Sequence, residues 1–166
     1  MATTTDKFDS LTGFSVDKTV VVDELRNVKD VNTFEIKNRN FADGKVSNYI
    51  LRGVGTGTLQ LDTIGTQVPI DNNTINFITG RIIGVNPQTD VYSAKFETVV
   101  SSDASGNTTL LSTMITVIKD DIPNGQSWDI QPLGSQNKFS YTTTITGTTN
   151  VIKWAVSTEV HSIEWQ

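Results

Sequence analysis

The side chains that could support nucleophilic or zinc-dependent catalysis are few in this sequence. His161 is the single histidine, and cysteine is absent. A Ser-His-Asp relay needs a histidine as its base, and zinc sites are built mainly from histidine and cysteine ligands. His161 shares its parity with Ser157 and Glu159 in a segment of alternating polar and apolar residues, so its side chain is expected to face solvent. The sequence therefore predicts neither a catalytic triad nor a zinc site.

Paired carboxylates are the remaining route to acid and base catalysis. The candidate pairs are Asp120 with Asp121 and Asp62 with Asp71. Each lies in a turn that contains Gly, Asn or Pro, where aspartate is expected for turn geometry alone. Asp120, Asp121 and Asn124 also offer oxygen ligands suited to calcium, but their spacing does not match the EF-hand loop. We predict no catalytic residue, no metal site and no cofactor, and hence a protein that is not an enzyme.

Two stretches could bind a ligand without catalysis. The glycines of residues 52–57 form G-x-G-x-G, which differs from the phosphate-binding G-x-G-x-x-G and does not lead into a helix, so a turn is predicted there. A carbohydrate-binding face built from exposed aromatic side chains is the second possibility. Its candidate residues are Tyr49, Trp128, Tyr141 and Trp165. We favour the alternative interpretation, in which most of these four residues belong to the core or its rim.

The charge of the chain argues against two classes of partner. The sequence holds 13 Lys and Arg residues against 18 Asp and Glu residues, which gives a net charge of -5, and the two signs are interspersed. A nucleic-acid surface needs a basic patch, and an anionic membrane attracts one. No apolar run approaches the roughly 18 residues that a membrane-spanning helix requires. We predict binding to neither nucleic acid nor membrane.

The elements that must position these side chains are predicted to be β-strands. Thr, Asn, Gly and Ser are abundant, and 36% of the residues are hydrophobic, which suits strands with one solvated face joined by polar turns. Short alternating segments recur between Gly, Asn and Asp turns, as in antiparallel sandwiches. The predicted fold is an all-β antiparallel β-sandwich of jelly-roll-like type with strands over residues 45–53, 56–62, 74–85, 90–102, 108–118, 127–132, 137–146 and 151–165.

In one predicted strand, the apolar residues change from one face of the strand to the other. Within residues 74–85, Phe77 lies on one parity while Ile78 and Ile82 lie on the other, with Gly80 between them. A β-bulge at Gly80 would restore a single inward face. The predicted structural core contains large apolar side chains from four strands: Phe77, Phe96, Trp128, Trp154 and Val156.

Residues 1–40 differ from the rest of the chain in having scattered apolar side chains without regular punctuation. We predict two parts, an N-terminal extended arm over residues 1–40 and a β-sandwich domain over residues 41–166. The arm is expected to dock on another chain, as strand addition allows. The alternative is an extra pair of strands that caps the main sheet of the same chain. The residues assigned to partner docking are Phe8, Leu11, Phe14, Val20 and Val22.

The sequence resembles a small β-sandwich module of tailed-bacteriophage virion structural proteins. The module has a strand of the "SAKFE" kind, a "D-x-x-G-N-T-T-L" turn and strand, a "W-D-I" strand and a closing segment that reads "T-G-x-x-x-x-I-x-W-A-V" in this chain. The likeness covers about residues 41–160. The residues that occupy these places are Asp103, Gly106, Thr109, Leu110, Trp128, Thr146, Gly147, Ile152, Trp154, Ala155 and Val156.

The resemblance implies a structural role on the surface of a virion, after synthesis in the host cytoplasm. The sequence has no heptads or fibrous shaft, so we expect a non-enzymatic capsid-surface decoration or cement protein, anchored by the arm. The alternative is a tail-fibre or baseplate appendage that acts as a host-binding, glycan-binding adhesin module. The expected partners are other virion proteins, either the major capsid protein or tail proteins, and we expect a homotrimer because several attachments raise the effective concentration.

Overall fold

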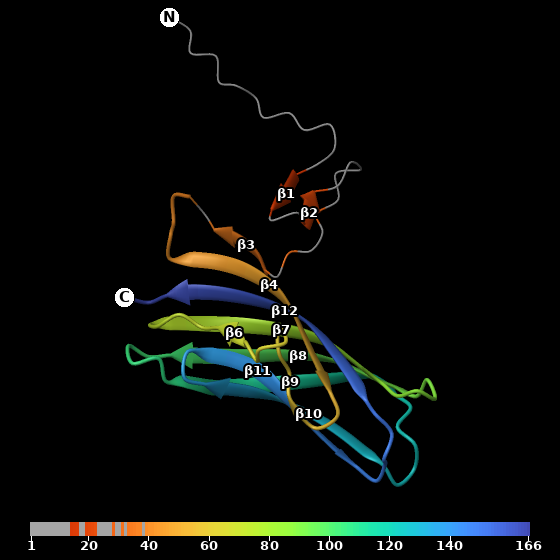
Figure 1. Ribbon diagram of the computed structural model, residues 1–166. Coiled ribbons are helices and arrows are strands. Elements are labelled where there is room, and N and C mark those ends of the chain that lie inside the picture. Colours follow the sequence, from red (N-terminus) through yellow and green to blue (C-terminus); the bar gives the residue numbers. More distant parts are fainter. Residues whose placement is uncertain (1–13, 17–18, 23–27, 29–30, 32, 38) are drawn as a thin grey trace, which may run out of the picture. The chain divides into compact units, whose positions relative to one another are not determined.

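The computed structural model in Figure 1 describes residues 14–16, 19–22, 28, 31, 33–37 and 39–166. The chain divides into two compact units, Met1–Asn32 and Thr33–Gln166. In the first unit, β1 (Phe14–Val16) pairs antiparallel with β2 (Thr19–Val22). Phe14, Val20 and Val22 of the predicted docking residues lie in these strands, and Phe8 and Leu11 lie outside the described residues.

The second unit is built from two antiparallel sheets, so the predicted all-β class is confirmed. The larger sheet has six strands in the order β3-β4-β12-β7-β8-β9. These strands are β3 (Thr33–Lys37), β4 (Gly44–Val54), β12 (Lys153–Glu164), β7 (Thr74–Val85), β8 (Val91–Ser102) and β9 (Thr108–Asp120). The smaller sheet has four strands: β10 (Ser127–Ser135), β11 (Lys138–Thr146), β5 (Gly57–Thr58) and β6 (Val68–Pro69).

The boundary between the units differs from the one expected from the sequence. β3 pairs with β4 from Thr33↔Tyr49 to Lys37↔Lys45. Residues 33–37 are therefore part of the larger sheet, and the division falls after Asn32 instead of after residue 40. β3 thus forms an edge strand of this sheet. The alternative interpretation of residues 1–40 expected a pair of strands to be added to the sheet, and β3 is one such strand.

Side chains that alternate along the strands fill the space between the two sheets. In β12, every second residue from Trp154 to Ser162 is buried, as expected for a strand with one covered face. The Trp154 ring lies edge to face with Trp128 of the smaller sheet, at a centroid distance of 6.4 Å. Tyr141 of β11 makes the same kind of contact with Phe96 of β8, at 5.8 Å. Aromatic pairs in this geometry join the sheets at two places.

Phe77 is not a core residue, which corrects the prediction. β7 keeps one phase over its whole length and pairs with both neighbours without a register shift, so no bulge forms at Gly80. The inward residues at the start of β7 are the polar Thr74 and Asn76, and Phe77 lies on the outer face with 43% of its surface exposed. Asn76 is satisfied there because its Nδ2 donates to the Thr74 hydroxyl at 2.9 Å.

Gly80 has a packing role instead. A Cβ atom at this position would lie 2.2 Å from the Tyr141 hydroxyl oxygen, so only glycine leaves room for the phenol. The other four predicted core residues are at most 3% exposed: Phe96, Trp128, Trp154 and Val156.

Burial raises the pKa of Tyr141 from 10.0 to about 12, against the smaller opposite effect of the hydrogen bond from Thr158. Above pH 10 an unfolded tyrosine loses its proton while the folded one keeps it, so the free energy of unfolding falls as pH rises through this window. We expect a loss of about 1 kcal/mol between pH 9 and pH 11, measured by urea unfolding. Tyr141→Phe removes the titrating group and should show a smaller fall. An equal fall in both proteins would contradict this assignment.

Candidate functional site

The most unusual surface of the described structure is β9, the edge strand of the larger sheet. None of its 13 residues is buried. Met114, Val117 and Ile118 are 56%, 52% and 69% exposed. No charged residue occurs from Thr108 to Ile118. Long, exposed, apolar edges offer unpaired backbone groups to other chains, and native proteins usually protect them.

The smaller sheet covers β9 only in part: β10 comes close to Thr108 at the start of the strand, and the residues after Thr108 are exposed. Ile115 and Val117 lie directly opposite Phe96 and Ala94 of β8, so these four side chains share the inner face of the sheet. Phe96 and Ala94 are 1% exposed, whereas Ile115 is 40% and Val117 is 52% exposed. The apolar inner face therefore continues past the covered core onto β9. Figure 1 shows β9 next to β8, as the last strand of the larger sheet.

Two irregularities divide β9 into segments. The register with β8 shifts between Ser93 and Ala94 and between Val99 and Val100, which leaves Ile118 and Leu111 of β9 without a directly opposed residue. Bulges of this kind increase local twist and partly protect an edge. The segment 112–117 between them is regular. The charged residues Lys119 and Asp120 come after it, at the end of the strand.

The predicted carboxylate pairs are engaged in separate local interactions. Asp62 Oδ1 accepts hydrogen bonds from the Ile64 and Thr66 backbone N–H groups at 3.0 and 3.1 Å. The hydrogen bonds from Thr66 hold the pKa of Asp62 below its usual value. Asp71 instead pairs with Lys45, with 2.6 Å between Oδ2 and Nζ. The two carboxylates have different partners and stabilise different parts of the chain.

Asp120 and Asp121 each interact with a residue two positions away in the sequence. Asp120 Oδ1 accepts a hydrogen bond from the Ile122 N–H at 3.2 Å, and Asp121 Oδ1 lies 2.8 Å from Lys119 Nζ. Within the described part of the chain, no group of three or more His, Cys, Asp or Glu side chains could hold a metal ion. His161 lies on the outer face with its Nε2 2.9 Å from Glu159 Oε1.

The aromatic side chains proposed for glycan stacking are mostly inside. Tyr49, Trp128 and Tyr141 are 7%, 3% and 0% exposed, and Trp165 is 44% exposed. Stacking on a sugar ring needs an exposed aromatic face. Of the four residues named from the sequence, Trp165 alone meets that requirement.

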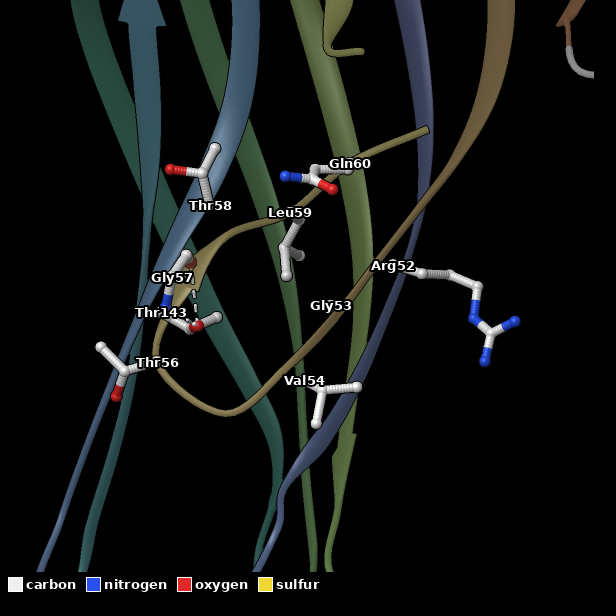
Figure 2. A pocket seen from close by; sticks show the side chains of 9 residues that line it. All are labelled: Arg52, Gly53, Val54, Thr56, Gly57, Thr58, Leu59, Gln60 and Thr143. Carbon is white, nitrogen blue, oxygen red and sulfur yellow. Dashed lines mark hydrogen bonds between the residues drawn. The ribbon is translucent and has the colours of Figure 1, made fainter. Parts of the chain in front are cut away.

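The turn predicted at residues 52–57 borders a hollow of about 300 Å³, shown in Figure 2. Its polar groups are used internally: Thr143 Oγ1 donates to the Gly55 carbonyl at 2.8 Å and accepts from the Gly57 N–H at 3.1 Å. Arg52 is the charged residue among those that line the hollow, and its guanidinium points away from the hairpin. The arrangement fastens β5 to β11 and presents no pair of reactive groups.

The sequence contained a signal for the β9 edge that the strand prediction did not use. Apolar residues occur on both parities in this segment, at Leu110, Leu111, Met114, Ile115, Val117 and Ile118. A strand with one solvated face shows strict alternation, so apolar residues on both faces indicate either a fully covered strand or one that another chain covers.

Protein families, curated proteins and solved structures were compared with the chain. No family model and no curated protein matches the chain. Among solved structures, the chain is similar to the tailspike protein gp49 from Acinetobacter baumannii bacteriophage Fri1, a capsular polysaccharide depolymerase. The identity is 18% and the TM-score is 0.46, and the match covers 91% of this chain and 23% of the tailspike chain. This chain therefore spans about a quarter of the length of the protein it matches.

The comparison corrects one sequence-based prediction. The chain was predicted not to be an enzyme, and this is contradicted because the similar protein is a depolymerase. We therefore withdraw the prediction that the chain is not an enzyme. The depolymerase activity itself belongs to the tailspike. Both the sequence resemblance and this comparison name proteins of bacteriophages. Among the described residues, no helix is long and apolar enough to cross a membrane.

Proposed function

We propose that the chain is a structural module of a tailed-bacteriophage virion, built into a tail appendage through contacts that cover β9. The observation that supports this role most directly is the uncovered apolar edge itself. Its inner face continues the core past the part that the smaller sheet covers, with Ile115 and Val117 exposed beside buried Phe96 and Ala94. A second chain that covers this surface would remove apolar area from water at about 25 cal/mol per Å².

The residues behind the phage resemblance support the fold of the module. Trp128, Trp154 and Val156 lie in the core, and Gly106 and Gly147 lie in turns with φ of 79° and 77°. These are residues that specify strands and turns, so the likeness concerns architecture. The exposed β9 surface is what this chain adds to it.

The tail is proposed in preference to the capsid surface. The decoration hypothesis depended on an anchoring arm over residues 1–40, but residues 33–37 form β3 of the larger sheet. The module that the sequence resembles occurs in tail-fibre proteins and in other surface-exposed virion proteins, so the resemblance is compatible with a tail appendage. A role of residues 1–32 in docking remains part of the proposal, whereas the homotrimer expected from the sequence does not, because the β9 contact argued below joins two copies.

Gold-labelled antibodies against the chain, imaged on purified particles of the phage that encodes it, test the location. Label on the tail is the expected result. Label confined to the head would overturn the tail assignment, and unlabelled particles would overturn the virion role.

A pair of phage variants tests the surface. Ile115→Lys places a charge on the exposed edge and is expected to reduce incorporation into particles at least tenfold. Ile64→Lys is the matched control, because Ile64 is 88% exposed and lies in a loop outside the sheets. Equal incorporation of both variants would contradict a role for β9.

A further inference from the structure

We propose that the partner of β9 is β9 of a second copy of this chain, paired antiparallel about a twofold axis at Met114. This inference rests on the proposed role of β9 in assembly and names the occupant of that edge. The contact would join two larger sheets into one continuous sheet. Each copy would supply the backbone groups that the other lacks.

The sequence of β9 is complementary to itself in this register. Antiparallel pairing about Met114 places Leu110 opposite Ile118 and Leu111 opposite Val117. The polar Ser112 then lies opposite Thr116. Directly opposed side chains lie about 4.5–5.5 Å apart, so apolar residues meet apolar ones at the ends of the pairing and hydroxyl groups meet at Ser112 and Thr116, while Thr113 lies opposite Ile115.

Neighbouring registers are less favourable. A shift by one residue would oppose inner-face and outer-face side chains, because strand side chains alternate. A twofold axis at Ile115 would place Leu110 opposite the charged Asp120. An axis at Thr113 would oppose Leu110 and Thr116. Pairing about Met114 is the register that keeps both apolar pairs.

Charge also permits this contact between identical chains. Each chain carries a net charge of -5, which opposes association in general. The segment from Thr108 to Ile118 is uncharged, however, and the charged residues Lys119 and Asp120 would lie opposite Thr109 and Thr108. No two like charges face each other along the proposed pair.

The contact has a reasonable size. The regular segment 112–117 can form about six backbone hydrogen bonds across the axis, near the lower end of the roughly 10 ± 5 found in typical interfaces. The exposed Val117 of each copy would lie against Leu111 of the other, at the bulge that ends the regular segment. Backbone pairing and apolar burial therefore act together.

Engineered cysteines test the register directly, because the chain has none of its own. Met114→Cys would place two thiols at the axis, with Cα atoms about 4.5–5.5 Å apart, inside the range of about 4.4–6.8 Å that a disulfide requires. Thr116→Cys is the matched control on the same strand face, with symmetry-related Cα atoms about 14 Å apart. Met114 is 56% exposed, so both full-length variants are expected to fold, which circular dichroism would verify.

Under mild oxidation of the purified chain at micromolar concentration, we expect at least tenfold more disulfide-linked dimer from Met114→Cys than from Thr116→Cys. The double variant Ser112→Cys with Thr116→Cys should also cross-link, because these positions face each other across the axis. Failure of both Met114→Cys and the double variant, or equal cross-linking by Thr116→Cys, would overturn the proposal. A native mass of three copies without the residue-114 disulfide would overturn it too.

The outcome is separable from that of the proposed function. A disulfide at residue 114 together with unlabelled phage particles would leave the twofold contact standing and remove the virion role. Tail labelling without the disulfide would do the reverse, and would assign β9 to a different virion chain.

Discussion

Replacing Trp154 with alanine is expected to lower the free energy of unfolding by about 3–5 kcal/mol, the usual range for a buried tryptophan. Trp154 is 1% exposed and lies edge to face with Trp128 and Tyr92, at 6.4 and 6.3 Å between ring centroids. Its removal would leave a cavity between the two sheets and break both aromatic contacts. The change in the urea midpoint at constant slope measures the loss.

Trp165→Ala is the matched control for this experiment. Trp165 has the same side chain but is 44% exposed, near the end of the chain. We expect its replacement to change the free energy of unfolding by less than about 1 kcal/mol. Comparable losses in the two variants would show that Trp154 does not join the sheets as described.

Trp154→Phe should be less harmful than the alanine variant. The Trp154 Nε1 atom is buried and has no hydrogen-bond partner among the described residues. An unsatisfied buried donor is destabilising in its own right. Phenylalanine removes this donor and keeps most of the apolar contact, which partly offsets the smaller ring.

Gly147→Ala is expected to be the most damaging conservative change, with a loss of about 3 kcal/mol or more. Gly147 has a φ of +77°, a conformation that is strained for any side chain, and a Cβ there would lie 2.1 Å from the Gly125 carbonyl oxygen. The obstacle is backbone, so it cannot rotate away. The turn after β11 and the turn before β10 are packed together at this point.

Gly55→Ala separates the two causes. Gly55 has a similar φ of +71°, but a Cβ at that position would meet nothing within 4 Å. We expect a loss of about 1–2 kcal/mol from the strained φ alone. Equal effects in urea unfolding would mean that the close approach to Gly125 contributes nothing.

The strands could be predicted where the alternation of apolar and polar residues in the sequence matches the burial of their side chains in the structure. In β12, the alternation that predicts a half-buried strand is the alternation observed, with Trp154 and Val156 inside and His161 outside. In β7 the pattern misled, because Thr74 and Asn76 are the buried residues and Phe77 is not. The hydrogen bond between Asn76 and Thr74 satisfies these two buried polar side chains. The positions of the apolar residues in the sequence do not predict this hydrogen bond.

The candidate site could be predicted only in part. The carboxylates that the sequence brings to notice lie in or next to turns, and each is engaged by a structural partner, as Asp62 is by Thr66 and Asp71 is by Lys45. The position of β9 at the edge depends on how far a second sheet extends, which is a property of the whole topology. Apolar residues on both faces of residues 108–118 indicated that something must cover them, but not whether it came from the same chain.

Amide hydrogen exchange along β9 in the full-length chain tests the central claim that another chain completes this edge. In the assembled form, the amides of residues 112–117 that point away from β8 are expected to exchange at least tenfold more slowly than in Ile115→Lys or on dilution to monomer. Rates that are fast and identical in all these states would show that water alone covers β9, and would contradict the account.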